Sequence, residues 1–325
     1  MVLVDVVGWA TSVFSRVGDL AFYWLALAVA LKTAESALLA LVWRNTLVAA
    51  YPRAKLSFKN AWGGSQGGTA INALTPAHAG TAAMIGIFRS SIPGSSVAGL
   101  TAATAVQSVF FTAVGILVVI AAVILRQGTV SKGSPSDETG GFFSSHPVLI
   151  PVIVAVAVAA LVVLWPRLKP RLLGTWRQIK EGGRVFADRR RYVTQVALPS
   201  AASYACRIGV NIVFMAGFGI PITAFTVVLV ASSHMLSGLF SITPGGVGQS
   251  QALDVATLRR SAAAGDVAAF SITQHAVILI WNVVLGIAVA SWAFGFRRAG
   301  EMLSSMRRHP REQAGLSVAA VDKDS

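Results

Sequence analysis

The stretch SITPGGVGQS, Ser241–Ser250, interrupts an apolar part of the chain with one proline and three glycines. Proline removes a backbone donor and glycine tolerates non-helical backbone, so we expect a helix to break here. A second stretch, LTPAHAG at Leu74–Gly80, shares an aliphatic residue, Thr-Pro and a glycine four positions after the proline. Long apolar runs follow both stretches. The sequence therefore raises the question of why an apolar chain interrupts its helices twice in nearly the same way.

The composition places the chain in a membrane. Of its 325 residues, 54% are hydrophobic and 12% are charged, and the mean hydropathy is +0.67. Six apolar runs reach or approach the roughly 20 residues that a helix needs to cross a bilayer. We expect an all-α, polytopic membrane protein with about six or seven long helices and two re-entrant broken segments. The runs are Leu20–Trp43, Val97–Leu125, Val148–Trp165, Val193–Phe218, Ile222–Phe240 and Val267–Phe294.

Basic residues predict which side of the membrane each connection faces. The connection 166–192 carries nine lysines or arginines against two acids, so we expect it in the cytoplasm. The basic segment 44–59 and the basic C-terminal tail are expected on the same side. The Gly/Ser-rich segment 126–146 has balanced charge and is expected outside. We attribute the formal net charge of +14 to cytoplasmic faces beside anionic lipid headgroups, and we expect no nucleic-acid partner.

The number of predicted membrane crossings conflicts with the expected cytoplasmic position of the basic tail. Val193–Phe218 ends outside, and two further ordinary crossings would leave the basic tail outside, against the charge bias. One solution is that 222–260 dips in from the outside, breaks and returns, while 61–89 dips in from the cytoplasm. Matching breaks entered from opposite sides are expected of an inverted repeat whose broken helices meet near the midplane. Chance turns at the interface are the alternative, because Thr-Pro and glycine are common in membrane helices.

The residues at both breaks resemble a known family. PGGVGQSQA, Pro244–Ala252, is similar to the second signature of the lysylphosphatidylglycerol synthase transmembrane family, also called flippase-like membrane proteins. Asn72–Gln107 is similar to the first signature of that family, an Asn followed by a Pro with a Gly four positions later. The resemblance extends over roughly Leu20–Arg298 and implies a flippase-like transmembrane domain.

The chain departs from the family at charged positions. The family usually has two arginines and one glutamate in its first signature, a Glu-Arg pair in the next helix and a glutamate in its second signature. Neutral residues stand at these positions here, so a mechanism that relies on those carboxylates, proton coupling above all, is in doubt. The replacing residues are His78, Thr81, Met84, Val106, Gln107 and Gln251.

The helix after each break begins with unsatisfied N–H groups and the positive end of its dipole, which suits a phosphate. We therefore predict a site for an anionic phospholipid or a polyprenyl-phosphate-linked lipid. For Arg207, snorkelling or bonding to carbonyls at a break is an equal alternative. The candidate headgroup residues are Thr75, His78, Gly80, Thr81, Arg207, Thr243, Gly245, Gly246, Gly248, Ser250 and Gln251.

Other polar residues inside the apolar runs are costly in lipid, so we expect them to face the protein interior. Lys32 and Glu35 are three residues apart on one helical face and are expected to pair. A lone membrane histidine is expected to hydrogen-bond between helices rather than to carry protons. Asp254 is the only acid near a signature. The intramembrane polar candidates are Lys32, Glu35, Gln107, Asn211, His234, His275 and Asn282.

The sequence shows no catalytic pattern. The five histidines lack metal-binding spacing, and GGSQGG at Gly63–Gly68 lacks the lysine that ends a phosphate-binding loop, so it is interpreted as the approach to the first break. We expect no enzyme activity, no metal and no cofactor. The alternative to lipid translocation is a non-transporting scaffold or accessory partner of a lipid-modifying enzyme or glycosyltransferase, docked through the basic connection 166–192.

The sequence predicts one membrane domain with two flanking segments. Residues 1–19 have apolar positions at helical spacing and are predicted to form an amphipathic helix in the interface. Residues 20–298 form the flippase-like transmembrane domain, and 299–325 form a basic, disordered cytoplasmic tail. We expect the protein to lie in the cytoplasmic membrane.

Overall fold

The computed structural model describes residues 22–75, 79–130, 188–239, 248–258 and 261–295, which form helices joined by turns, with no strand among them. Four helices are long and apolar enough to cross a membrane, which confirms the expected all-α class. Of the other predicted runs, Val148–Trp165 lies outside the described residues and Ile222–Phe240 forms a helix of only 16 residues. The predicted flanking segments 1–19 and 299–325 also lie outside. The four long helices are Phe22–Ala50, Val97–Ala122, Arg189–Gly217 and Gly265–Phe294.

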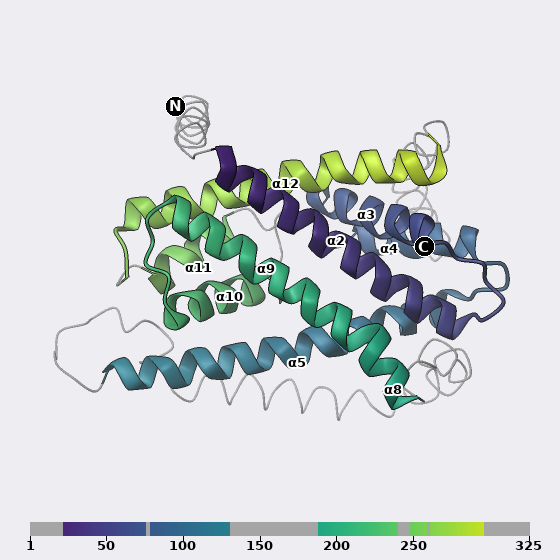
Figure 1. Ribbon diagram of the computed structural model, residues 1–325, viewed down its shortest axis with the longest axis horizontal. Coiled ribbons are helices and arrows are strands. Elements are labelled where there is room, and N and C mark those ends of the chain that lie inside the picture. Colours follow the sequence, from purple (N-terminus) through teal and green to yellow (C-terminus); the bar gives the residue numbers. More distant parts are fainter. Residues whose placement is uncertain (1–21, 76–78, 131–187, 240–247, 259–260, 296–325) are drawn as a thin grey trace, which may run out of the picture.

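The same order of elements occurs twice along the chain (Figure 1). Each time a long helix is followed by a hairpin of two shorter helices and then by another long helix. The first set is α2 (Phe22–Ala50), the hairpin of α3 (Phe58–Leu74) and α4 (Ala79–Ser91), and α5 (Val97–Val130). The second set is α9 (Leu198–Gly217), the hairpin of α10 (Ala224–Leu239) and α11 (Gln249–Leu258), and α12 (Ala264–Phe294). The two predicted breaks separate the two helices of each hairpin.

The two sets pack against each other through equivalent helices. α2 packs against its counterpart α9. α3 packs against α12, and α10, the counterpart of α3, packs against α5, the counterpart of α12. Figure 1 shows that α2 is antiparallel to α9 and that α5 is antiparallel to α12. Each hairpin therefore packs against the last helix of the other set.

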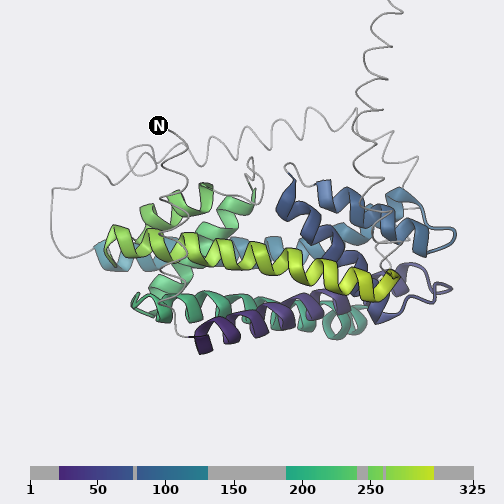
Figure 2. The same ribbon diagram turned by 90° about the horizontal axis from the view of Figure 1, so that it is seen from above.

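The two hairpins enter the structure from opposite ends. In Figure 1, α3 begins and α4 ends at the right, whereas α10 begins and α11 ends at the left. Figure 2 shows the same arrangement from above, with the end of α3 and the start of α4 on one side, and the end of α10 and the start of α11 on the other, nearest the middle. The segment between α2 and α3 and the basic α8 (Arg189–Tyr192) both lie at the right end. Two segments that the charge pattern predicts on one side of the membrane thus lie at one end of the molecule.

α8 continues through a π-helical turn, Val193–Ala197, into α9. Pro199 lacks the N–H that would bond the carbonyl of Gln195 in a regular helix. The side-chain Nδ2 of Asn45, on α2, donates to this carbonyl at 2.9 Å. α2 thus supplies the donor that proline removes, and this bond fixes α2 against the start of α9.

The glycine-rich sequence GGSQGG lies within α3, where this helix packs against both α4 and α12. A Cβ on Gly63 would collide with the Cβ of Ala293 on α12, and one on Gly68 would lie 2.7 Å from the carbonyl oxygen of Gly80 on α4. The stretch interpreted from sequence as the approach to the break is therefore a close-packing surface. Its glycines permit three helices to meet at short distance.

Gly80→Ala is expected to destabilise the protein, because its Cβ would collide with the carbonyl oxygen of Gly68 and lie 2.6 Å from the backbone nitrogen of Asn72. Overpacking of this kind costs roughly 1–3 kcal/mol. Gly86→Ala on the same helix is the matched control, since a Cβ there meets nothing within 4 Å. Thermal unfolding of the purified protein in detergent measures both variants. Equal stability of the two variants would contradict the close contact between α3 and α4.

Candidate functional site

Two cations share one carboxylate where α2 packs against α9. Glu35 is 1% exposed, and its Oε2 accepts a hydrogen bond from Lys32 Nζ at 2.9 Å. Its Oε1 accepts from Nε and Nη2 of Arg207 at 2.9 and 2.7 Å. The predicted pair of Lys32 and Glu35 is present. Arg207 joins it from α9 as an ion-pair partner, which was not among the roles predicted for this residue.

This Glu35 cluster, Lys32, Glu35 and Arg207, has one positive charge in excess. Within the described residues, no second acidic side chain forms an ion pair with Lys32 or Arg207. The Arg207 side chain is 41% exposed, and its guanidinium lies 5.5 Å from the ring centroid of Phe111 on α5. An unbalanced charge at membrane depth is unfavourable without a counter-ion. The cluster can therefore accept an anion at its open side, next to Arg207.

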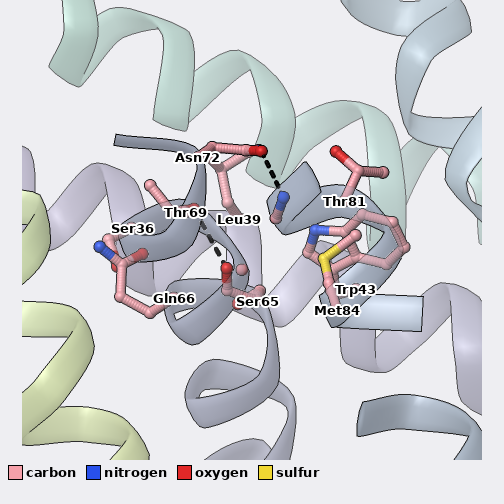
Figure 3. A pocket seen from close by; sticks show the side chains of 11 residues that line it. Ser36, Leu39, Trp43, Ser65, Gln66, Thr69, Asn72, Thr81 and Met84 are labelled. Carbon is pink, nitrogen blue, oxygen red and sulfur yellow. Dashed lines mark hydrogen bonds between the residues drawn. The ribbon is translucent and has the colours of Figure 1, made fainter. Parts of the chain in front are cut away.

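A cavity of about 180 Å³ lies between α2, α3 and α4 (Figure 3). Three apolar side chains line it, namely Leu39, Trp43 and Met84, together with the backbone of Gly68 and Gly80. None of its lining residues is charged. Two predicted headgroup residues, Gly80 and Thr81, are among them. The polar side chains in its wall are Ser36, Ser65, Gln66, Thr69, Asn72 and Thr81.

Hydrogen bonds fix some of these polar groups and leave others available. The Ser36 hydroxyl accepts from Trp62 Nε1 at 2.7 Å and donates to Gln66 Oε1 at 3.0 Å. Asn72 Oδ1 accepts the backbone N–H of Gly80 at 2.7 Å, which caps the start of α4 (Figure 3). Within the described residues, Gln66 Nε2 is buried without a partner and the Thr81 hydroxyl has none.

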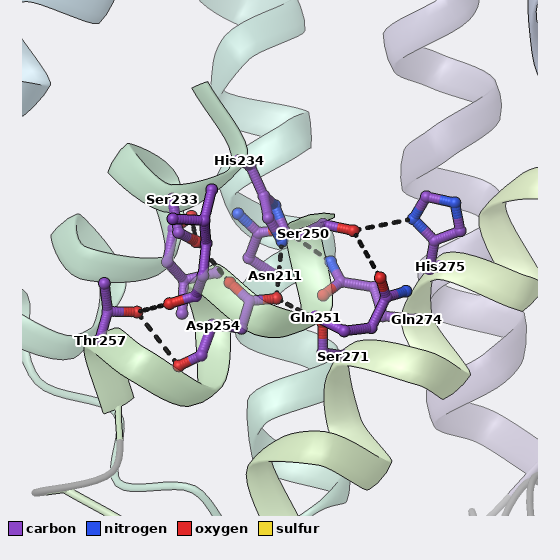
Figure 4. A network of polar contacts seen from close by, with 12 residues as sticks. Asn211, Ser233, His234, Ser250, Gln251, Asp254, Thr257, Ser271, Gln274 and His275 are labelled. Atoms are coloured by element: carbon purple, nitrogen blue, oxygen red, sulfur yellow. Dashed lines mark hydrogen bonds and ion pairs between the residues drawn. The ribbon is translucent and has the colours of Figure 1, made fainter. Parts of the chain in front are cut away.

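The second hairpin holds a buried carboxylate (Figure 4). Asp254 on α11 is fully buried. Its Oδ1 accepts from the hydroxyl of Ser233 on α10, and its Oδ2 accepts from the hydroxyl of Ser271 on α12 at 2.5 Å. The Nε2 of His234, also on α10, lies 3.3 Å from Oδ2. This carboxylate ties α11 to both of its neighbours.

Gln251 closes the start of α11. Its Oε1 accepts the backbone N–H of Gly248 at 2.6 Å, which caps the first turn of the helix. Gly248 has a φ of +92°, a conformation that favours glycine. The Ser250 hydroxyl donates to Gln251 Oε1 at 3.1 Å and lies 3.4 Å from Nδ1 of His275 on α12. These three predicted headgroup residues therefore shape the helix start in the structure.

Residues 2–286 match the family model described as the lysylphosphatidylglycerol synthase TM region. The chain belongs to this family. The match confirms the resemblance at the two breaks and covers most of the chain. No curated protein and no solved structure matches. Family membership and the long apolar helices together make this chain a multi-pass membrane protein.

The remaining candidates occupy separate places in this member of the family. Asn211 Oδ1 on α9 accepts from Gln274 Nε2 on α12 at 2.7 Å, so it joins two helices as expected of a polar residue in lipid. The Thr75 hydroxyl donates to the carbonyl of Ile71 and ends α3. Gln107 on α5 and Asn282 on α12 are half-buried. His78, Thr243, Gly245 and Gly246 lie outside the described residues.

Sequence reasoning missed two parts of the site. Asp254 was noted as the nearest acid without a role, although an acid inside an apolar segment is itself a signal. Most of the polar wall of the cavity was not predicted, because the contact of Ser36 with Gln66 joins residues 30 positions apart. Of the polar wall, Asn72 and Thr81 stood inside a recognised signature, and Thr81 alone was among the predicted headgroup residues.

Asp254→Leu is expected to destabilise the protein by at least about 2 kcal/mol, because the buried hydroxyls of Ser233 and Ser271 would lose their acceptor. Asp254→Asn keeps an oxygen acceptor and is the matched control, with a smaller loss. Denaturant unfolding in mixed micelles compares the two variants. If the leucine variant is as stable as the asparagine variant, the carboxylate does not hold the three helices together.

Proposed function

We propose that this protein binds an anionic lipid or a lipid-linked sugar and moves it across the cytoplasmic membrane. The observation that carries the proposal is the excess positive charge of the Glu35 cluster. Glu35 lies near the centre of the 29-residue α2, and Arg207 is partly open beside it. A lipid that crosses between the leaflets brings its phosphate to this depth, and guanidinium groups bind phosphate well.

The arrangement of the hairpins supports a path for the lipid. In the proposal, the two sets of helices are an inverted repeat, and each hairpin is a re-entrant segment that enters from its own side of the membrane. The right end in Figure 1 is then the cytoplasmic end, because the basic segments lie there. Broken helices inside a membrane are tolerated where they are buried in protein or line a wet cavity. The polar cavity at the first hairpin fits this requirement.

In this proposal Arg207 holds the phosphate from the side, and the start of α4 adds its partial positive charge. The N–H of Gly80 is already bonded to Asn72, and the N–H of Gly248 to Gln251. The two half-helix starts thus act through their dipoles rather than through these two donors. The main contact is a charge-assisted hydrogen bond from Arg207 to the phosphate. The N–H groups that Arg207 does not use to bind Glu35 are available for this bond.

Leaflet exchange in liposomes tests the proposal. Fluorescent phosphatidylglycerol and polyprenyl-phosphate probes are expected to exchange faster with the protein than in protein-free vesicles. Arg207→Met leaves Lys32 and Glu35 as a neutral pair and is expected to slow exchange at least about tenfold, since a hydrogen bond to a charged group contributes roughly 1.5–3 kcal/mol. Arg207→Lys keeps the charge and is expected to retain part of the rate.

Arg89→Met is the matched control, because this exposed arginine lies in the last turn of α4, away from the Glu35 cluster. It is expected to exchange lipids at the wild-type rate. An Arg207→Met variant that exchanges at the wild-type rate would remove the phosphate-binding role of the cluster. A wild-type protein that exchanges no anionic probe would overturn translocation and favour the accessory role beside a lipid-modifying enzyme.

A further inference from the structure

We propose that the cavity between α2, α3 and α4 binds an uncharged, hydroxylated headgroup, a glycerol or a single hexose, joined to the phosphate that the Glu35 cluster holds. The inference rests on the proposed function, because it places the rest of the headgroup of the same lipid. It assigns a binding site to the cavity and a class of ligand to the protein.

The wall of the cavity has the chemistry of a site for hydroxyl groups. Its polar side chains are all neutral hydroxyls and amides, which both donate and accept hydrogen bonds. Ser65 and Thr69 donate to carbonyls of their own helix, so their oxygens keep lone pairs for a ligand. Trp43 adds an apolar ring beside them. A sugar or glycerol presents the matching combination of hydroxyl groups and C–H surface.

One buried donor in the wall lacks a partner. Gln66 is 4% exposed, and its Nε2 makes no hydrogen bond within the described residues. A buried donor without a partner costs about 1–3 kcal/mol. Its Oε1 is held by Ser36, so the amide is fixed in place. This nitrogen is closed to water, so it stays inside the wall, and the unpartnered Thr81 hydroxyl is the group in the same wall that a ligand hydroxyl can reach.

The size of the cavity suits a small headgroup. A cavity of about 180 Å³ has room for one glycerol or one hexose ring. The described wall also carries no carboxylate that would pair with an amine. The cavity therefore selects against an aminoacylated, cationic headgroup.

The cavity and the Glu35 cluster are joined along one face of α2. Lys32 and Ser36 are four residues apart, so their side chains lie on the same face about 6 Å apart along the helix axis. Leu39 and Trp43 continue this face into the cavity. A phosphate held near Lys32 and Arg207 therefore has its ester substituent within reach of Ser36 and the cavity.

Binding to the detergent-purified protein tests the inference with two pairs of lipids of equal charge. The first pair is phosphatidylglycerol and phosphatidylmethanol, and the second is polyprenyl phosphohexose and methyl polyprenyl phosphate. The hydroxylated member of at least one pair is expected to bind about tenfold tighter, which corresponds to about 1.4 kcal/mol. Thr81→Leu, which fills the cavity and removes a hydroxyl, is expected to abolish this preference. Thr81→Ser is the matched control and is expected to keep the preference.

Some outcomes identify the headgroup as a glycerol or a sugar, and the others contradict the inference. A preference for phosphatidylglycerol alone supports a glycerol, and one for the phosphohexose alone supports a sugar. Equal binding within both pairs, or a preference that survives in both Thr81→Leu and a second variant, Gln66→Met, overturns the cavity site while lipid binding itself stands. Failure of all four lipids to bind overturns the phosphate site and the proposed function with it.

Discussion

Each interruption of a helix inside a membrane leaves backbone groups that need partners, and the rest of this fold depends on how those partners are supplied. Three interruptions within the described residues are closed by a side-chain amide. The pairs are Asn72 with the N–H of Gly80, Gln251 with the N–H of Gly248, and Asn45 with the carbonyl of Gln195. Amides are uncharged, so these three closures need no ion. The excess charge of the Glu35 cluster is therefore not needed to close a break.

The two sets of helices share an arrangement but differ in chemistry. In the first, Glu35 is contacted by two cations and the adjacent hairpin carries a neutral polar cavity. In the second, Asp254 is contacted by hydroxyls and a histidine and is fully buried. The groups around Glu35 leave an excess positive charge that attracts an anion. The groups around Asp254 provide its carboxylate with hydrogen-bond partners and leave no such excess. We infer that ligand recognition belongs to the first set and that Asp254 stabilises the second.

Local patterns in the sequence predicted the all-α class, the two breaks and the pair of Lys32 and Glu35, because these features depend on residues a few positions apart. Arg207 was predicted near a lipid, but its bond to Glu35 spans 172 positions and has no local signature. The role of GGSQGG was missed for a similar reason, since a glycine needed for contact with another helix looks the same as one needed for a bend. Tertiary packing supplied what periodicity and spacing left undetermined.

The exchange of partners between the two sets also determines which parts of the protein are able to move together. α3 and α4 meet at Gly68 and Gly80, and α3 meets α12 at Gly63, so these three helices are joined by contacts with no room for sliding. α10 is likewise packed on α5. A motion that preserves these contacts does not separate one set from the other. Such a motion moves the first hairpin together with α12, and the second hairpin together with α5. The two groups would rotate about the place where α2 crosses α9. Each rigid body therefore combines segments from both halves of the chain.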